Sequence, residues 1–199
     1  MIKVLSFDLQ GTISDAKFSD NFWIELLPMQ YANKNNITLE DSKRILRDKF
    51  KQMGKYDILY YDDSYWAKEL DFDTIEVLKE AGINPSLDEK LIKYINKVNL
   101  PKIILSTTTD LFINYELGNE IKLFDRTYSC VNYFNSGGKT KEIFLRVADE
   151  LKVDSSEILH IGDSVEMDIE NAKKANVNTI LFDGNVDNLI NEIDKYLEV

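Results

Sequence analysis

The stretch VLSFDLQGTIS, residues 4–14, decides how the rest of the sequence is interpreted. Its first four residues are mostly apolar, and Asp8 stands where this run ends. A short apolar run that stops at a polar turn is typical of a buried strand in a parallel sheet. Gly11 and Thr12 supply the turn. We therefore expect Asp8 at the carboxyl end of a strand, where open α/β sheets bind their ligands.

The remainder of the chain repeats this strand pattern at intervals. Further strands are predicted at residues 102–107, 125–131, 157–163 and 178–183. Apolar residues at helical spacing predict helices at residues 88–98, 141–151, 168–175 and 186–197. Strands that alternate with helices of this length predict an α/β fold, with a parallel sheet flanked by helices on both faces.

One segment, residues 17–82, does not follow this alternation. It contains no strand pattern and instead predicts helices at residues 19–33, 39–53, 56–70 and 73–81. Thr38, followed by Asp41, is a typical start signal for the second of these helices. The sequence therefore predicts two domains, an α/β core formed by residues 1–16 and 83–199, and an inserted all-helical domain formed by residues 17–82.

Charge and composition exclude several classes of partner. The chain of 199 residues carries 35 acidic and 24 basic side chains, a formal net charge of -11. Nucleic-acid binding needs a basic excess, so we expect no nucleic-acid partner.

Apolar runs are too short to cross a bilayer, and the first residues do not resemble a signal peptide, so we expect no membrane association and a cytoplasmic location. Cys130 has no second cysteine to pair with and is expected to be buried. The oligomeric state is not indicated.

Polar side chains collect at the predicted carboxyl edge of the sheet. They are the hydroxyls of Ser106 and Thr107, the carboxylates of Asp163 and Asp168, and Lys139 in a glycine-rich loop before a helix. Together with Asp8 they predict an anion site beside a site for a hard cation.

Two nearby residues qualify this interpretation. Lys141 is an alternative to Lys139 because the register of the loop is not determined by the sequence. His160 lies inside a predicted strand, so we interpret it as a core residue and not as a catalytic one.

These residues lie in four segments, FDLQGT, IILST, GGKTKEIF and IGDSVEMD. In this order they resemble the four motifs of the haloacid dehalogenase (HAD) superfamily, and the helical insertion resembles its C1 cap. A following segment, IENAKKANVNTILF, matches the family pattern except that Asn176 replaces a glycine. The resemblance implies a HAD-like Rossmannoid core with an inserted helical cap.

The resemblance also implies roles for individual residues. Asp8 would attack a phosphoryl group and form an aspartyl-phosphate. Mg²⁺ would be held by Asp8, the main-chain carbonyl of Gln10 and Asp163, with support from Asp168. Phosphoryl oxygens would be held by Ser106, Thr107 and Lys139. The implied activity is hydrolysis of a small phosphorylated metabolite.

Gln10 departs from the family pattern, in which a second aspartate acts as general acid and base. Glutamine donates hydrogen bonds but does not transfer protons. We therefore expect slow turnover, or selectivity for substrates whose leaving group needs no proton.

Three alternatives stay open at this point. One is dehalogenase-like carbon–halogen cleavage, although that branch uses no metal and lacks the acid that Asp163 supplies. A second is phosphonatase-like carbon–phosphorus cleavage, with a cap lysine among Lys49, Lys51 and Lys55. The third is a non-catalytic protein that binds a phosphate or a metabolite. The sequence does not show which residues of the aromatic stretch 56–66 face the core.

Overall fold

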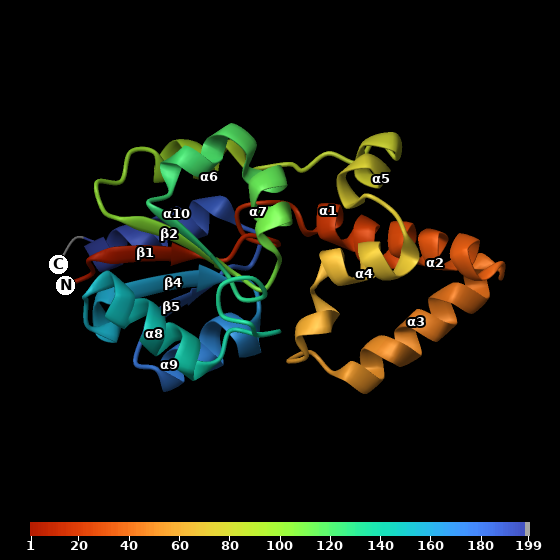
Figure 1. Ribbon diagram of the computed structural model, residues 1–199. Helices are drawn as coiled ribbons and strands as arrows, with labels where there is room; N and C mark the ends of the chain where they lie inside the picture. The colour runs from red at the N-terminus through yellow and green to blue at the C-terminus, as the bar shows by residue number, and fades with distance from the viewer. Residues whose placement is uncertain (198–199) are drawn as a thin grey trace.

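A computed structural model of the chain describes residues 1–197 and shows a five-stranded parallel sheet with helices on both faces (Figure 1). The strand order is β3-β2-β1-β4-β5, so the first strand lies in the centre. This confirms the predicted fold class. The strands are β1 (Val4–Phe7), β2 (Lys102–Ser106), β3 (Arg126–Ser129), β4 (Ile158–Gly162) and β5 (Asn178–Leu181).

The two faces of the sheet bury separate hydrophobic clusters because side chains alternate along each strand. Leu5 and Phe7 of β1 pack in one cluster, and Val4 packs in the other. The first face is covered by α6 (Glu89–Ile95), α7 (Asp110–Leu117) and α10 (Val186–Leu197). The second is covered by α8 (Lys141–Leu151) and α9 (Asn171–Lys174). Short helical turns η3 (Gly118–Leu123), η4 (Ser155–Glu157) and η5 (Val165–Glu170) complete this part.

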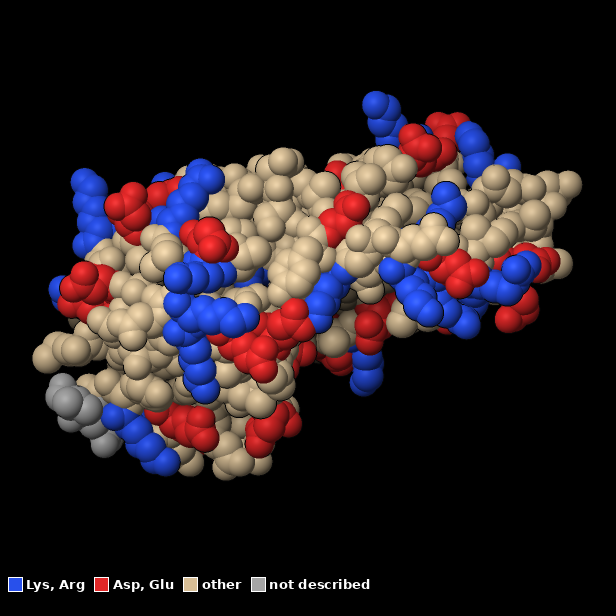
Figure 2. Space-filling model, turned by 90° about the horizontal axis from the view of Figure 1, so that it is seen from below, with Lys and Arg blue, Asp and Glu red and all other residues tan. Residues whose placement is uncertain are grey.

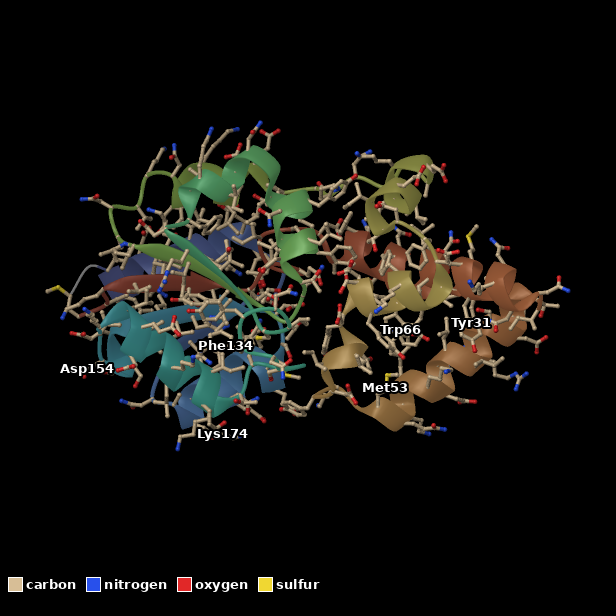
Figure 3. The ribbon with its side chains drawn as sticks, viewed as in Figure 1. Tyr31, Met53, Trp66, Phe134, Asp154 and Lys174 are labelled. Carbon is tan, nitrogen blue, oxygen red and sulfur yellow. The ribbon has the colours of Figure 1, made fainter. Side chains whose placement is uncertain are left out.

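The helices between β1 and α6 form a separate layer beyond the carboxyl ends of the strands (Figure 1). Trp66 and Met53 lie between α4 and α3 (Figure 3), in a cluster that also contains Leu27 and Leu46. A second cluster joins Phe18 and Leu78 of this layer to the core helix α7. The elements are α1 (Ala16–Asp20), η1 (Asn21–Leu26), α2 (Leu27–Asn35), α3 (Leu39–Met53), η2 (Ile58–Tyr60), α4 (Asp63–Leu70) and α5 (Thr74–Glu80).

Local sequence signals place some of these helices correctly. Helix α3 has the predicted bounds, and Thr38 Oγ1 accepts a hydrogen bond from the backbone N–H of Asp41 at 3.1 Å. The division of the chain into domains at residues 17 and 82 stays a prediction.

One expectation about helices is wrong, and one helix was not expected. Residues 56–70 do not form one helix, because the side chains of Asp57 and Asp62 accept backbone N–H groups and each starts a new turn. Helix α7 was not predicted between the second and third strands. Its buried residues include Glu116 among apolar ones, so the helical pattern of apolar residues is interrupted.

The two layers meet through close contacts. Tyr56 donates a hydrogen bond to Glu166 Oε1 at 2.6 Å, and Lys55 forms an ion pair with the same carboxylate. A Cβ atom on Gly137 would collide with the carbonyl oxygen of Asp57, so glycine is needed for this approach. Within residues 1–197, no helix is long and apolar enough to cross a membrane.

Candidate active site

Asp8 lies at the carboxyl end of β1, as its position after the apolar run predicted. Its backbone N–H is bonded to the carbonyl of Ile161 at 2.8 Å, which ties the residue to β4. Asp8 is 7% exposed, and its Oδ1 accepts the backbone N–H of Leu9 at 2.8 Å. Burial raises the pKa of Asp8 to about 6, against the opposing effect of the nearby Lys139 charge.

Lys139 is buried at the start of α8 and joins two carboxylates. Its Nζ lies 2.8 Å from Asp8 Oδ1 and also forms an ion pair with Asp168 Oδ1. Burial opposes the charge of Lys139, but the two carboxylates outweigh it and raise the lysine pKa. The alternative, Lys141, has an exposed side chain. The structure therefore brings Lys139, and not Lys141, to Asp8.

A hydrogen-bonded chain behind Asp168 was not foreseen from the sequence. His160 Nε2 lies 3.0 Å from Asp168 Oδ1, and His160 Nδ1 lies 2.8 Å from Ser6 Oγ. An ionised Asp168 only accepts, so Nε2 carries the proton and Nδ1 accepts from Ser6. Burial opposes the charge of Asp168, but Lys139 and His160 hold its pKa well below the usual range. His160 is the expected core residue, and it also positions Asp168.

Three carboxylates form a group that suits a hard cation. Oxygens of Asp8, Asp163 and Asp168 lie within 4.8 Å of one another. Burial, followed by the charge of Asp168, raises the pKa of Asp163. Gly11 has φ +80°, and a Cβ there would collide with Asp163 Oδ2, so this glycine gives the carboxylate its room. Three oxygen ligands with one lysine as counter-charge match the donors that Mg²⁺ prefers.

Ser106 is the last residue of β2, and Thr107 follows it at the same sheet edge. Phe7, the last residue of β1, is paired with Ile104 of β2 and with Ile161 of β4, so β2 extends two residues and β4 one residue beyond the end of β1. Ser106 is buried and Thr107 is half-buried. Within the described residues, neither has a side-chain hydrogen bond to Asp8 or Lys139. The structure therefore brings them to the predicted edge without testing their role.

Gln10 has an unexpected partner in Glu116 of α7. Gln10 Nε2 donates to Glu116 Oε1 at 2.6 Å, and Ser14 donates its hydroxyl to the other carboxylate oxygen. Glu116 is 2% exposed, and burial raises its pKa to about 7. Sequence reasoning missed this residue because it is 106 positions away from Gln10. The other buried residues of α7 are apolar, which makes the buried glutamate unusual.

Comparison with known proteins agrees with this geometry. A family model for haloacid dehalogenase-like hydrolases matches residues 2–176. The GMP/IMP nucleotidase YrfG of Escherichia coli (strain K12) is 24% identical over 94 residues, which are 47% of this chain and 42% of that protein. The match thus spans less than half of the length of that relative.

Solved structures share the fold. A HAD phosphatase from Thermococcus onnurineus superimposes with a TM-score of 0.79 and 18% identity, covering 99% of this chain and 98% of its own. A 2-haloacid dehalogenase from Pseudomonas syringae pv. Tomato DC3000 gives a TM-score of 0.61 at 18% identity, covering 94% and 89%. At such identities the similarity concerns the fold.

Proposed function

The chain belongs to the haloacid dehalogenase-like hydrolases, and we propose that it is a Mg²⁺-dependent phosphatase that forms an aspartyl-phosphate at Asp8. The substrate class is a small phosphorylated metabolite. The proposal is carried by one observation, the buried Asp8 carboxylate held 2.8 Å from the buried Lys139 ammonium at the carboxyl edge of the sheet. That arrangement places a nucleophile beside a fixed positive charge.

The nucleophile is prepared by its hydrogen bonds. Leu9 N–H and Lys139 both contact Oδ1 of Asp8. Within the described residues no hydrogen bond is found to Oδ2, so this oxygen is available to react. Lys139 is held by Asp168, which in turn is held by His160. Such a chain keeps the ammonium in place, and preorganised charges cost no rearrangement during the reaction.

The reaction proceeds in two steps. Asp8 Oδ2 forms a bond to phosphorus while the ester P–O bond breaks, and the leaving group takes up a proton from solvent because Gln10 supplies none. A water molecule then attacks phosphorus, the Oδ2–P bond breaks, and inorganic phosphate leaves with the Asp8 carboxylate restored. Lys139 pairs with the phosphoryl oxygens in both steps, and Ser106 and Thr107 supply hydroxyl donors at the same edge.

The metal site belongs to this proposal. The residues that would hold Mg²⁺ are Asp8, Asp163 and Asp168 together with the carbonyl of Gln10. When bound, the ion supplies further positive charge against the phosphoryl oxygens. The carboxylate group described above fits an ion of this kind, which favours a phosphatase over the metal-free dehalogenase alternative.

Gln10 determines which leaving groups are tolerated. Its amide N–H is already engaged by Glu116, and an amide does not deliver a proton. General acid–base help is worth roughly 10²- to 10⁴-fold in rate. Esters of poor leaving groups therefore lose most, and aryl and acyl phosphates lose least.

The test is Mg²⁺-dependent release of phosphate from a panel of esters. We expect turnover of 4-nitrophenyl phosphate and acetyl phosphate and slower turnover of an alkyl phosphate. GMP and IMP belong in the panel because the nucleotidase relative is named for them.

Asp8→Asn should lower the rate by about 1,000-fold or more, since it removes the nucleophile. Asp149→Asn, on the exposed face of α8, is the matched control and should retain activity. If Asp8→Asn releases phosphate at the wild-type rate, the aspartyl-phosphate mechanism is wrong.

A further inference from the structure

A cavity of about 890 Å³ extends into the helical layer. Gln10, two residues after Asp8 in the chain, lines it together with Tyr60 and Tyr61, so the cavity adjoins the turn that carries the reactive carboxylate. Sites for small molecules usually have volumes of about 300–1,000 Å³. The cavity therefore has room for the leaving group of a phosphate ester.

The outer wall of this cavity is cationic. Lys43, Arg47 and Lys51 line it from α3 at intervals of four residues, which puts them on one face of the helix. Lys55 follows just beyond the end of the helix. Figure 2, seen from the side of α3, shows Lys and Arg side chains gathered over this layer.

Two of these cations are already paired and two are not. Lys43 contacts both carboxylate oxygens of Glu25, at 2.9 and 2.7 Å, and Lys55 is paired with Glu166. Within residues 1–197, Arg47 and Lys51 have neither an ion pair nor a side-chain hydrogen bond. Asp20 is the acidic member of the same wall. In a chain with a net charge of -11, this wall has an excess of positive charge.

Aromatic side chains also line the cavity. Phe50 and Tyr60 lie with ring centroids 5.0 Å apart, and Tyr60 and Tyr61 lie 4.7 Å apart. Trp23 completes this part of the wall. Aromatic faces pack against flat or apolar groups, so the cavity suits a leaving group with such a body.

From these observations we infer that the cavity takes a phosphate monoester whose leaving group carries a second anionic group, bound by Arg47 and Lys51. The inference rests on the proposed function, because the cavity becomes a leaving-group site only if phosphoryl transfer occurs at Asp8. The second anion is a carboxylate or another phosphate, since both accept the paired hydrogen bonds that a guanidinium donates.

The first experiment compares two substrates that differ in this charge alone. They are 4-(carboxymethyl)phenyl phosphate and the corresponding carboxamide, which have phenol leaving groups of similar ability. We expect kcat/KM to be about tenfold higher for the carboxylate, the size of a hydrogen-bonded charge interaction. A ratio near one for the wild-type enzyme would overturn the inference.

Variants then locate the source of the preference. Arg47→Gln combined with Lys51→Gln should bring the ratio of the two kcat/KM values close to one. Lys49→Gln removes the same charge from the same helix, but Lys49 is not part of the cavity wall, so the ratio should stay at its wild-type value. A preference that survives the double variant, or that disappears in the control, would contradict the assignment.

Binding measurements separate this inference from the proposed function. The phosphonate analogues of the two substrates cannot form the aspartyl-phosphate, so calorimetry reports their binding alone. A tenfold tighter Kd for the carboxylate, lost in the double variant, supports the cavity assignment even if no ester is hydrolysed. Equal Kd values refute it, whereas hydrolysis of both esters at equal rates leaves the phosphatase proposal intact.

Discussion

At the scale of single residues, Gln10 shows how a neighbour distant in the sequence changes the meaning of a substitution. The sequence suggests that Gln10→Asp would restore the missing proton transfer. The structure places Gln10 against the buried Glu116, whose carboxylate accepts the amide N–H. An aspartate at this position would therefore lie close to a second carboxylate and would donate nothing to it.

We expect Gln10→Asp alone to lower the free energy of unfolding by about 1–3 kcal/mol, because a buried acceptor loses its donor. Combined with Glu116→Gln, it should recover this loss and raise kcat on alkyl phosphates by about 10²-fold over the wild type. Urea denaturation and steady-state kinetics check both statements. Glu116→Gln alone serves as control and should bring no gain. A single variant that is as stable and as active as the double variant would refute the role given to Glu116.

His160 and Ser6 also show that a neighbour distant in the sequence changes how a residue is interpreted. They are direct neighbours in the pairing of β1 with β4, and the chain from Ser6 through His160 reaches Asp168. A polar residue inside a predicted strand is ordinarily interpreted as a satisfied core residue. Only the register of the sheet shows that this pair also positions the carboxylate that holds Lys139.

At the level of secondary structure, helices with a clear amphipathic pattern could be predicted and others could not. The bounds of α3 and α8 agree with the sequence because each has an amphipathic pattern. The aromatic residues of the stretch 56–66 recur at helical spacing. The capping side chains of Asp57 and Asp62 nevertheless divide this stretch into separate helical turns. Short-range hydrogen bonds of this kind compete with a weak periodic pattern.

Helix α4 also carries a buried acid at its junction with the core. Asp63 is fully buried, and Thr109 donates its hydroxyl to Asp63 Oδ1. Within the described residues, Oδ2 of Asp63 has no hydrogen-bond partner. Burial raises the pKa of Asp63 above its ordinary value of 3.8. A carboxyl whose pKa is raised in the folded state stabilises it at low pH, and this contribution is lost as the pH rises through the folded-state pKa.

Asp63→Asn should therefore gain stability relative to the wild type as the pH rises from about 4 to 8. The comparison uses free energies of unfolding measured by urea denaturation along that series. Asp48→Asn, on the exposed side of α3, is the control and should show a constant difference from the wild type. If the stability difference between Asp63→Asn and the wild type does not change with pH, the buried carboxyl is not the cause.

At the scale of the whole molecule, two layers are joined by an aromatic contact. Phe112 of α7 packs edge-on against Phe22 at a centroid distance of 5.0 Å and against Phe18 at 5.6 Å. The same layers also meet at Tyr56 and Glu166. The way the helical layer sits on the core therefore depends on both junctions.

Phe112→Ala should cost about 3–5 kcal/mol of unfolding free energy, and it should also lower kcat/KM by about tenfold because the helical layer shifts. Leu189→Ala is the matched control, since it removes a buried side chain of α10 far from the junction. It should cost about 2–5 kcal/mol and leave kcat/KM unchanged below its melting temperature. Equal kinetic effects of the two substitutions would show that the loss reflects stability alone.

The fold class, and the sheet edge at which the polar residues collect, follow from the sequence alone. Apolar runs that end at Asp8, Ser106 and Asp163 indicate this, because a buried strand ends where the apolar residues give way to polar ones. The order of the four motifs then led to the family, which the family match confirms.

The partners of those residues become visible in the folded protein. Glu116 beside Gln10, His160 behind Asp168, and the cationic face of α3 above the cavity each join segments far apart in the chain. Such contacts arise from strand register and helix packing, which depend on the whole molecule, whereas capping and periodicity depend on a few neighbouring residues. The substrate class we propose depends on long-range contacts, since it follows from side chains that meet only in the folded protein.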